Sequence, residues 1–276
     1  MSGTPKTSVA FQGERGAFSE DAIVKLFGDV AVRPCRTLND VFSAVWRGEV
    51  PFGVVPVENS TAGSINDTYD LLLRYDLNIY GEAQLRVSHC LMSLQGETIE
   101  CLQKVYSHPQ ALAQCEEFLG KLTVEIVPSY DTAGSAKLIK EQRLTRCAAV
   151  ASKRAAQFYG LDVLAPNIET NPRNYTRFLA ISREKAQRAA KNKTSIIFAT
   201  QNVPGALYNC MGAFATRNVN LTKLESRPSR DKPWEYVFYA DFEGHMEDPP
   251  CREALDELRR SNSLTKLLGS YPAAQD

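Results

Sequence analysis

Histidine is scarce in this chain, and no cysteines stand in a Cys-x-x-Cys pair. The three histidines, His89, His108 and His245, lie far apart. Zinc sites usually combine histidines and cysteines at short spacings, so we expect no metal site. The cysteines are scattered and odd in number, which is typical of reduced, mostly buried thiols in a cytoplasmic protein; they stand at positions 35, 90, 101, 115, 147, 210 and 251.

The chain also lacks net charge and long apolar runs. Its 32 basic and 32 acidic residues cancel, which removes the electrostatic reason to expect binding to nucleic acid or to an anionic membrane. No run is long enough to span a membrane, and residues 1–6 lack the apolar core of a signal peptide. A basic cluster at 183–193 is more simply a linker or a solvated helix than a nucleic-acid arm. We expect a cytoplasmic location.

What is present is an alternation of short apolar runs with helical patterns. Apolar residues make up 43% of the 276, enough for real cores in two domains or in a two-lobed domain with a small companion. Strand-like runs at 8–11, 30–32 and 52–57 alternate with helical stretches, a longer strand region is expected at 77–94, and the alternation restarts at 105. This order predicts α/β layers with parallel strands and functional loops at the strands' carboxyl ends.

One tetrapeptide occurs twice. Thr-Ala-Gly-Ser stands at 61–64 and at 132–135, each time after an apolar strand. We predict that each copy opens a helix whose N-terminus binds an anion, and that the pair faces a cleft suited to a dianionic small molecule.

The pattern changes after the polar stretch at 185–193. From residue 194 the expected order is β-α-β-β-α-β, the split ferredoxin-like arrangement of an α+β module. Gly205 stands at the strand-to-helix turn of this module, where free backbone N–H groups would suit the carboxylate of an amino acid. A simple helix start explains the same residue equally well.

Three segments carry polar residues where chemistry would need them. Glu58, Asn59 and Ser60 end a buried strand, although Ser64 and Asp67 nearby resemble a capping box that would explain polar neighbours. Ser107 reads as a helix N-cap, and Gln110 and Gln114 share one face of the helix that follows it.

The third segment, residues 174–181, places a hydroxyl and a guanidinium in an apolar strand. Burying Arg177 requires a fixed anion, either a protein carboxylate or a ligand. Thr176 beside it could hydrogen-bond a reacting oxygen. Taken alone, this segment favours the simpler interpretation of an ordinary strand with an exposed threonine and a structural Arg–Asp pair.

Together, these segments closely resemble the prephenate dehydratase family over nearly the whole chain. The motifs are VAFQG at 9–13, VPVENS at 55–60, SHPQ at 107–110, DTA at 131–133 and NYTRF at 174–178. The tail resembles the ACT regulatory domain, with PGAL at 204–207 and NLTKLESRP at 220–228. With no chorismate mutase region ahead of Ser8, the resemblance is to the monofunctional form.

The resemblance implies two α/β lobes like those of type II periplasmic-binding proteins at 8–185, the second lobe at about 86–165, and an ACT domain at 194–276. The implied reaction removes carbon dioxide and the ring hydroxyl from prephenate, giving phenylpyruvate for phenylalanine synthesis. Aromatisation drives it, so no cofactor is required.

The implied catalytic residues are Thr176, Glu58 and Asn59. A threonine hydroxyl is a poor proton source, so we expect Thr176 to donate a hydrogen bond to the departing oxygen, with Glu58 as the acid if burial raises its pKa. The expected substrate-binding residues are Arg177, Ser107, Gln114, Ser60, Thr61, Gly63, Thr132 and Ala133.

The resemblance also implies feedback regulation. Phenylalanine would bind between ACT domains of two subunits, in a homo-oligomer expected to be a dimer of dimers. The expected regulatory residues are Gly205, Ala206, Leu207, Glu225, Ser226 and Arg227.

Two rival functions remain open. Arogenate dehydratase has the same fold and leaving chemistry, and its substrate carries an amino group in place of the keto oxygen. The other rival is a non-catalytic amino-acid sensor on a binding-protein scaffold.

Overall fold

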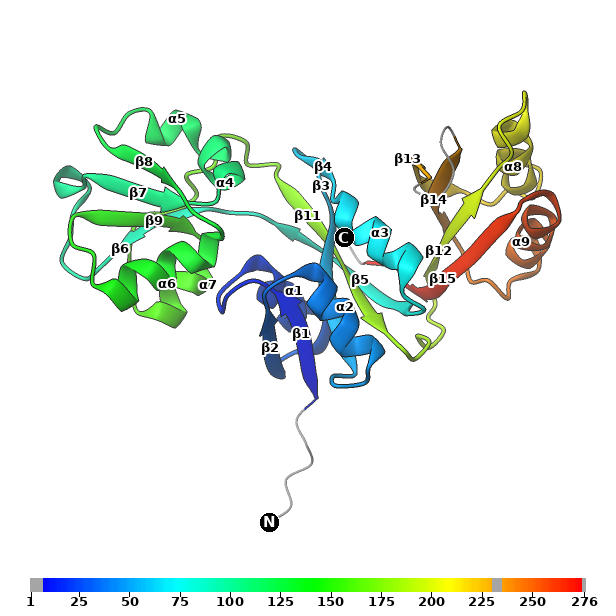
Figure 1. Ribbon diagram of the computed structural model, residues 1–276, viewed down its shortest axis with the longest axis horizontal. Coiled ribbons are helices and arrows are strands. Elements are labelled where there is room, and N and C mark those ends of the chain that lie inside the picture. Colours follow the sequence, from blue (N-terminus) through cyan, green and yellow to red (C-terminus); the bar gives the residue numbers. More distant parts are fainter. Residues whose placement is uncertain (1–6, 230–234, 275–276) are drawn as a thin grey trace, which may run out of the picture.

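A computed structural model describes residues 7–229 and 235–274 of the chain. Three bodies lie in a row, with the N-terminal lobe in the middle, the second lobe on one side of it and the C-terminal module on the other (Figure 1). Among the helices of these ranges, none is long and apolar enough to cross a bilayer.

The first lobe is built on a mixed sheet of order β2-β1-β3-β11-β5, with the short β4 paired to β3. β1 is parallel to β2 and β3, whereas β11 runs antiparallel to β3 and β5. The elements are β1 (Ser8–Gln12), α1 (Phe18–Phe27), β2 (Ala31–Cys35), α2 (Leu38–Trp46), β3 (Phe52–Asn59), β4 (Gly63–Ser64), α3 (Asn66–Arg74), β5 (Asn78–Arg86) and β11 (Tyr175–Ser182).

Local sequence explains these elements well. In α2, Thr37 and Asp40 form a reciprocal capping box at the N-terminus. Leu38, Val41 and Val45 then recur at helical spacing and are buried against the sheet.

The chain enters the second lobe after β5 and returns through β11. Its sheet has the order β10-β6-β9-β7-β8. The elements are β6 (Cys90–Ser93), a 3-10 turn (Ile99–Cys101), β7 (Lys104–Ser107), α4 (Pro109–Gln114), α5 (Glu116–Leu119), β8 (Glu125–Pro128), α6 (Thr132–Gln142), β9 (Cys147–Ala151), α7 (Lys153–Tyr159) and β10 (Asp162–Ala165).

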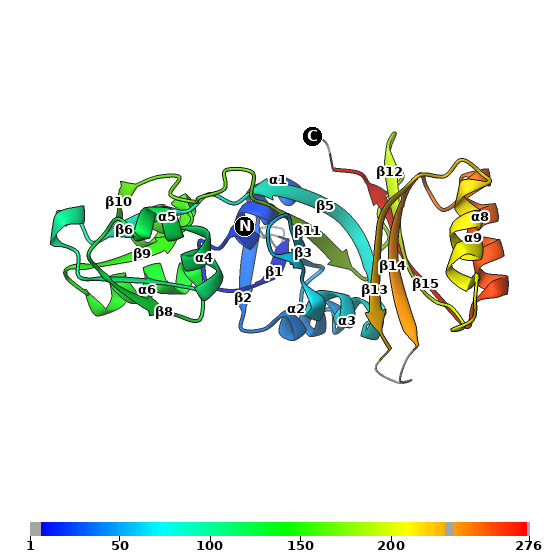
Figure 2. The ribbon, with the colours of Figure 1, turned by 90° about the horizontal axis from the view of Figure 1, so that it is seen from above.

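The C-terminal module is a four-stranded antiparallel sheet with two helices on its outer face (Figure 2). The strand order β13-β14-β12-β15 is that of a βαββαβ fold. The elements are β12 (Asn192–Ala199), α8 (Ala206–Ala215), β13 (Leu221–Pro228), β14 (Tyr236–Glu243), α9 (Pro249–Ser261) and β15 (Leu264–Pro272). The predicted two-lobed α/β region with a ferredoxin-like module is therefore confirmed.

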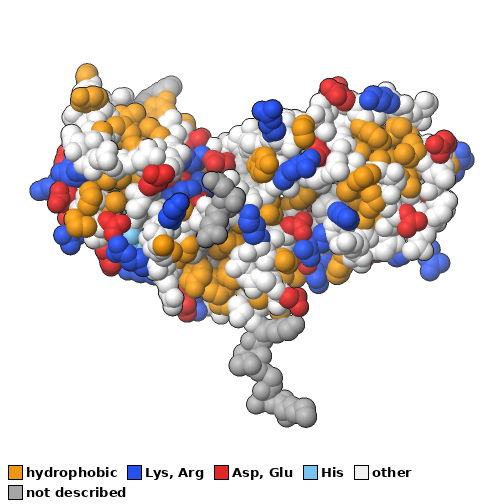
Figure 3. Space-filling model, turned by 180° about the vertical axis from the view of Figure 1, so that it is seen from behind, with side chains coloured by type: hydrophobic (Ala, Val, Ile, Leu, Met, Phe, Trp, Pro, Cys, Tyr) orange, Lys and Arg blue, Asp and Glu red, His pale blue; other side chains and the backbone are white. Residues whose placement is uncertain are grey.

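The inner face of the module sheet packs on the first lobe. One apolar cluster combines Val57, Leu72 and Ile79 of the lobe with Tyr239 and Leu268 of the module. The two bodies thus share a core. Elsewhere on the surface, acidic and basic side chains are interspersed, as zero net charge suggests (Figure 3).

Two predicted elements differ from the structure. The long strand expected at 77–94 is divided into β5 and β6, which belong to different lobes. The helix expected from Ser64 begins at Asn66, and Ser64 instead pairs with Glu58 in the short strand β4.

Candidate functional site

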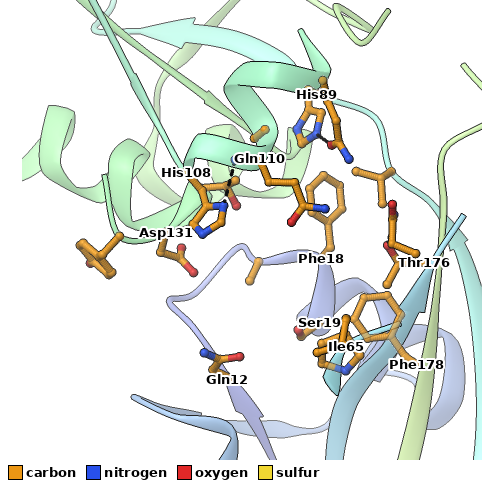
Figure 4. A pocket seen from close by; sticks show the side chains of 18 residues that line it. Gln12, Phe18, Ser19, Ile65, His89, His108, Gln110, Asp131, Thr176 and Phe178 are labelled. Carbon is orange, nitrogen blue, oxygen red and sulfur yellow. Dashed lines mark hydrogen bonds between the residues drawn. The ribbon is translucent and has the colours of Figure 1, made fainter. Parts of the chain in front are cut away.

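A cavity of about 270 Å³ lies between the two lobes. Gln12, Phe18 and Thr176 reach it from the first lobe, whereas His108 and Asp131 reach it from the second (Figure 4). Both lobes thus supply polar side chains to one space, as expected for a site that holds a small molecule.

Asn59 and Thr176 form a direct pair at the edge of this cavity. They face each other in the β3–β11 register, so their side chains lie on the same face of the sheet. The Asn59 Nδ2 donates to Thr176 Oγ1 at 2.9 Å and to Asn174 Oδ1 at 2.7 Å. Each side chain belongs to a residue that is 8% exposed, so the pair is held in place with limited access to water.

The other end of the Asn59 amide holds the turn after β3. Its Oδ1 accepts hydrogen bonds from the backbone N–H groups of Thr61 and Ala62 at 3.1 and 2.9 Å, and from the Thr61 hydroxyl at 2.7 Å. The prediction that 61–64 opens a helix is therefore wrong. Asn59 satisfies these N–H groups, and the chain turns back into β4 instead.

The second copy of the repeat opens a helix, as predicted. Thr132 is the first residue of α6, and Asp131 caps the helix by accepting from the N–H of Gly134 at 2.7 Å. Burial raises the pKa of Asp131, against the lowering effect of the N–H groups of Gly134 and Ala133. Phe18, at the start of α1, also lines the cavity. The N-terminus of α1 therefore lies at the cavity together with that of α6, in place of the helix start expected at 61–64.

Gln114 joins the second lobe to the first. Its Nε2 donates to Thr61 Oγ1 at 3.2 Å, and its Oε1 lies 2.9 Å from His89 Nε2. Burial lowers the pKa of His89, although the hydrogen bond to Gln114 and the charge of Glu169 act to raise it. The imidazole is thus neutral near pH 7.

Glu58 and Arg177 lie on the opposite face of the same strands. Successive residues of a strand point to opposite faces, so they cannot share the side of Asn59 and Thr176. Glu58 forms an ion pair with Lys223 of the module. This placement corrects the expectation that Glu58 is the acid, because its carboxylate does not line the cavity.

The expectation that Arg177 binds the substrate needs the same correction. Its Nε donates to Glu82 Oε2 at 2.7 Å and its Nη1 to Asp241 Oδ2 at 2.6 Å, while its Nη2 reaches Tyr271 Oη at 3.1 Å. Protein carboxylates therefore supply the anion that the buried guanidinium requires. Arg177 binds the module to the first lobe.

Four other residues expected to bind substrate lie away from the cavity, and two of them form hydrogen bonds with backbone groups instead. The Ser107 hydroxyl donates to the carbonyl of Val150 at 2.6 Å, and the cap of α4 is His108 instead. Ser60 Oγ donates to the carbonyl of Arg173 and accepts from the N–H of Tyr175. Ala133 is fully buried, and Gly63 lines a different hollow beside Glu58. These four do not reach the cavity.

The expected regulatory residues divide between two elements. Gly205, with φ +82°, precedes α8, which begins at Ala206 and Leu207. On β13, which also carries Ser226, Glu225 accepts from the Ser64 hydroxyl at 2.8 Å. Arg227 lies 3.5 Å from Asp70 in an ion pair, so β13 also contacts the first lobe.

Sequence reasoning missed His89 and Asn174 as neighbours of the site. His89 lies within the single strand region that the sequence predicts at 77–94. Asn174 lies just before the apolar residues of the next predicted strand. A polar residue at a strand boundary was the only available signal for either. Among residues 7–229 and 235–274, no three His, Cys, Asp or Glu side chains are grouped so that they could hold a metal ion.

Comparison with known proteins identifies the family. The family model described as prephenate dehydratase matches residues 9–186. Arogenate dehydratase/prephenate dehydratase 2 of Arabidopsis thaliana is 44% identical over 283 residues, covering 99% of this chain and 74% of that protein.

Two solved structures share the whole fold. A prephenate dehydratase from Arthrobacter aurescens, in complex with L-Phe, has a TM-score of 0.88 at 32% identity and covers 96% of this chain and 89% of its own. GqqA, described as a novel type of quorum quenching acylase, has a TM-score of 0.89 at 37% identity, covering 96% of this chain and 98% of its own.

Proposed function

Because the chain belongs to the prephenate dehydratase family, we propose that it converts prephenate into phenylpyruvate. The chain is thus a dehydratase, and its family acts in phenylalanine biosynthesis. In the proposed reaction the ring carboxylate leaves as carbon dioxide, and its bonding electrons move into the ring. The ring hydroxyl leaves from the far carbon and takes up one proton to become water.

The Asn59–Thr176 pair is the observation that carries this proposal. Asn59 Nδ2 donates a hydrogen bond to the hydroxyl oxygen of Thr176, so the hydroxyl hydrogen of Thr176 points away from Asn59. A hydroxyl fixed in this way can donate to an oxygen that gains negative charge as its bond to carbon breaks. Such a fixed donor stabilises the transition state more than the ground state.

The two carboxylates of prephenate need positive partners. Lysine and arginine are absent from the described residues that line the cavity. Backbone N–H groups at the start of α1, which has no side-chain cap, can take this role, because the positive end of the helix dipole favours an anion.

Turnover of prephenate and arogenate by the purified chain, measured side by side, tests the proposal. We expect phenylpyruvate from prephenate with the larger kcat/KM. A chain that turns over neither substrate refutes a dehydratase role and leaves the sensor, or the acylase chemistry named for GqqA, to be assayed next.

Arogenate is the second candidate, and Asp131 favours it. The Asp131 carboxylate lines the cavity, where it could pair with the ammonium group of arogenate but would repel a dianion. Asparagine also caps helices, so Asp131→Asn should leave α6 intact. If arogenate is the substrate, this change should lower its kcat/KM and leave that for prephenate unchanged or higher. If prephenate is the substrate, no such selective loss is expected.

We further propose that phenylalanine regulates the enzyme through the C-terminal module, as an ACT domain. The free start of α8 at Gly205, which has no side-chain cap, supports binding of an amino-acid carboxylate. Lys223 and Asp241 of the module contact Glu58 and Arg177, each adjacent in sequence to a residue of the Asn59–Thr176 pair. Ligand binding in the module therefore has a short route to the site.

This regulatory proposal includes a dimer of dimers. Light scattering with and without phenylalanine tests the assembly, and initial rates under the same conditions test inhibition. A monomer under both conditions, or rates unaffected by phenylalanine, contradicts it.

A further inference from the structure

His89 lies where the chain passes from the first lobe to the second, and it is 2% exposed. Its ring packs edge-on against Phe18, with the centroids 5.5 Å apart. Of its two nitrogens, Nε2 meets Gln114, whereas Nδ1 is buried with no hydrogen-bond partner among the described residues. A buried histidine with one nitrogen used and one unpaired calls for an explanation.

The neighbouring hydrogen bonds determine which nitrogen carries the proton. Gln114 donates through Nε2 to Thr61, so its Oε1 faces His89 and must accept. His89 is therefore the Nε2–H tautomer, and its unpaired Nδ1 has no proton to satisfy. In this tautomer the buried Nδ1 is an unpaired acceptor, whereas in the other tautomer it would be an unpaired N–H donor.

From His89 a single direction of donation runs through five side chains. His89 donates to Gln114, and Gln114 donates to Thr61. The Thr61 hydroxyl donates to Asn59 Oδ1 at 2.7 Å, and Asn59 Nδ2 donates to Thr176 Oγ1 at 2.9 Å. Each amide uses its nitrogen to donate and its oxygen to accept, so every link has the same direction. The chain ends at the hydroxyl hydrogen of Thr176, beside the cavity.

We propose that His89 is a positioning residue for the dehydratase reaction. Its Nε2–H holds the Gln114 amide in one orientation, and through Thr61 and Asn59 this fixes Thr176 as a donor toward the substrate. Bonds aligned in one direction polarise one another, so the chain also strengthens the last donor. The Gln114–Thr61 link joins the two lobes, so the chain is complete only when they are together. This role rests on the proposed function.

Without the His89 donor, the side-chain amide of Gln114 is free to flip by about 180°. Its oxygen would then face Thr61, and the Thr61 hydroxyl would donate to Gln114 instead of Asn59. His89→Leu removes the donor while keeping an apolar side chain, and His89→Gln keeps an N–H near the position of Nε2. We expect His89→Leu to lower kcat about tenfold, as for one buried hydrogen bond, with KM within about twofold. His89→Gln should restore most of kcat.

A double-mutant cycle separates positioning from general damage to the fold. If His89 acts through Gln114, then His89→Leu should change kcat little in a Gln114→Leu background. Full additivity of the two losses would overturn the proposal. So would equal loss in His89→Gln and His89→Leu when both keep the wild-type melting temperature.

Nitrogen NMR of the imidazole supplies a measurement that needs no turnover. Wild type should show a protonated Nε2 and an unprotonated Nδ1, and Gln114→Leu should weaken this preference. The opposite tautomer in wild type would refute the chain of donors. If wild type shows the expected tautomer but turns over neither substrate, the proposed function fails and the predicted hydrogen-bond direction still holds.

Discussion

Replacing Arg177 by methionine should destabilise the protein far more than removing a surface arginine. Arg177 is 7% exposed, and its guanidinium touches Glu82, Asp241 and Tyr271. Without it, Glu82 keeps Lys193 at 2.6 Å and the N–H of Ala274 at 2.9 Å. Asp241 keeps the hydroxyl of Ser195 but loses its cation.

Removing one partner of a buried ion pair usually costs about 3–5 kcal/mol. Because Glu82 stays paired, we expect the lower end, about 3 kcal/mol. Arg33→Met is the matched control, since Arg33 pairs with Glu49 at 2.7 Å with both side chains at least 40% exposed. Such a surface pair contributes at most about 1 kcal/mol.

Thermal unfolding of the two variants measures the difference. For a chain of this size, each kcal/mol lowers the melting temperature by about 2–4 °C. Equal shifts for Arg177→Met and Arg33→Met would refute the assignment of Arg177 as a buried link between the bodies.

The pH dependence offers a second check. Burial alone would raise the pKa of Glu82, but the charge of Arg177, the N–H of Ala274 and Lys193 lower it below its ordinary value. A carboxyl with a lowered pKa stabilises the fold above its unfolded pKa, and this contribution is lost as the pH falls through its folded pKa. The difference in the free energy of unfolding between wild type and Arg177→Met should therefore become smaller as the pH falls and Glu82 is protonated.

Three further predictions concern the site and its surroundings. Thr176→Val should lower kcat about 10²- to 10³-fold with little change in KM, whereas Thr176→Ser should retain most activity; near-normal turnover by the valine variant would remove the donor role. Gly16→Ala should lower the melting temperature more than Gly28→Ala, because a Cβ at Gly16 would lie 2.6 Å from the Ala155 Cα and at Gly28 meets nothing within 4 Å; equal shifts would contradict this. Lys223→Met should weaken inhibition by phenylalanine in initial-rate assays, and unchanged inhibition would exclude the Glu58 contact as a route.

Much of the fold could be predicted because it is encoded locally. The apolar run of β3 and the capping box at the start of α2 each indicate one element within a few residues. The turn at 61–64 could not be read in this way. Its N–H groups are satisfied by the side chain of Asn59, which in turn is held by Asn174 across the sheet. A helix start and such a turn use the same small residues.

The site was predictable in part for a similar reason. Thr176 and Asn59 stood out as polar residues at strand ends, and Gln114 as one face of a helix. Strand alternation already implied that Thr176 and Arg177 point in opposite directions. The sequence could not show which face meets the cavity, because that depends on where the module docks. The carboxylates of Glu82 and Asp241 lie 95 and 64 positions away from Arg177.

The core shared by the first lobe and the module has a consequence for protein engineering. A break in the polar stretch before β12 looks like a natural place to cut the chain. Cutting there would expose Leu72 and Ile79, which now pack under the module. It would also remove Lys266, whose ammonium group binds the carbonyls of Leu72, Leu73 and Tyr75 at the end of α3. A catalytic fragment without the module would therefore need a redesigned apolar face and a new helix cap to remain soluble and folded.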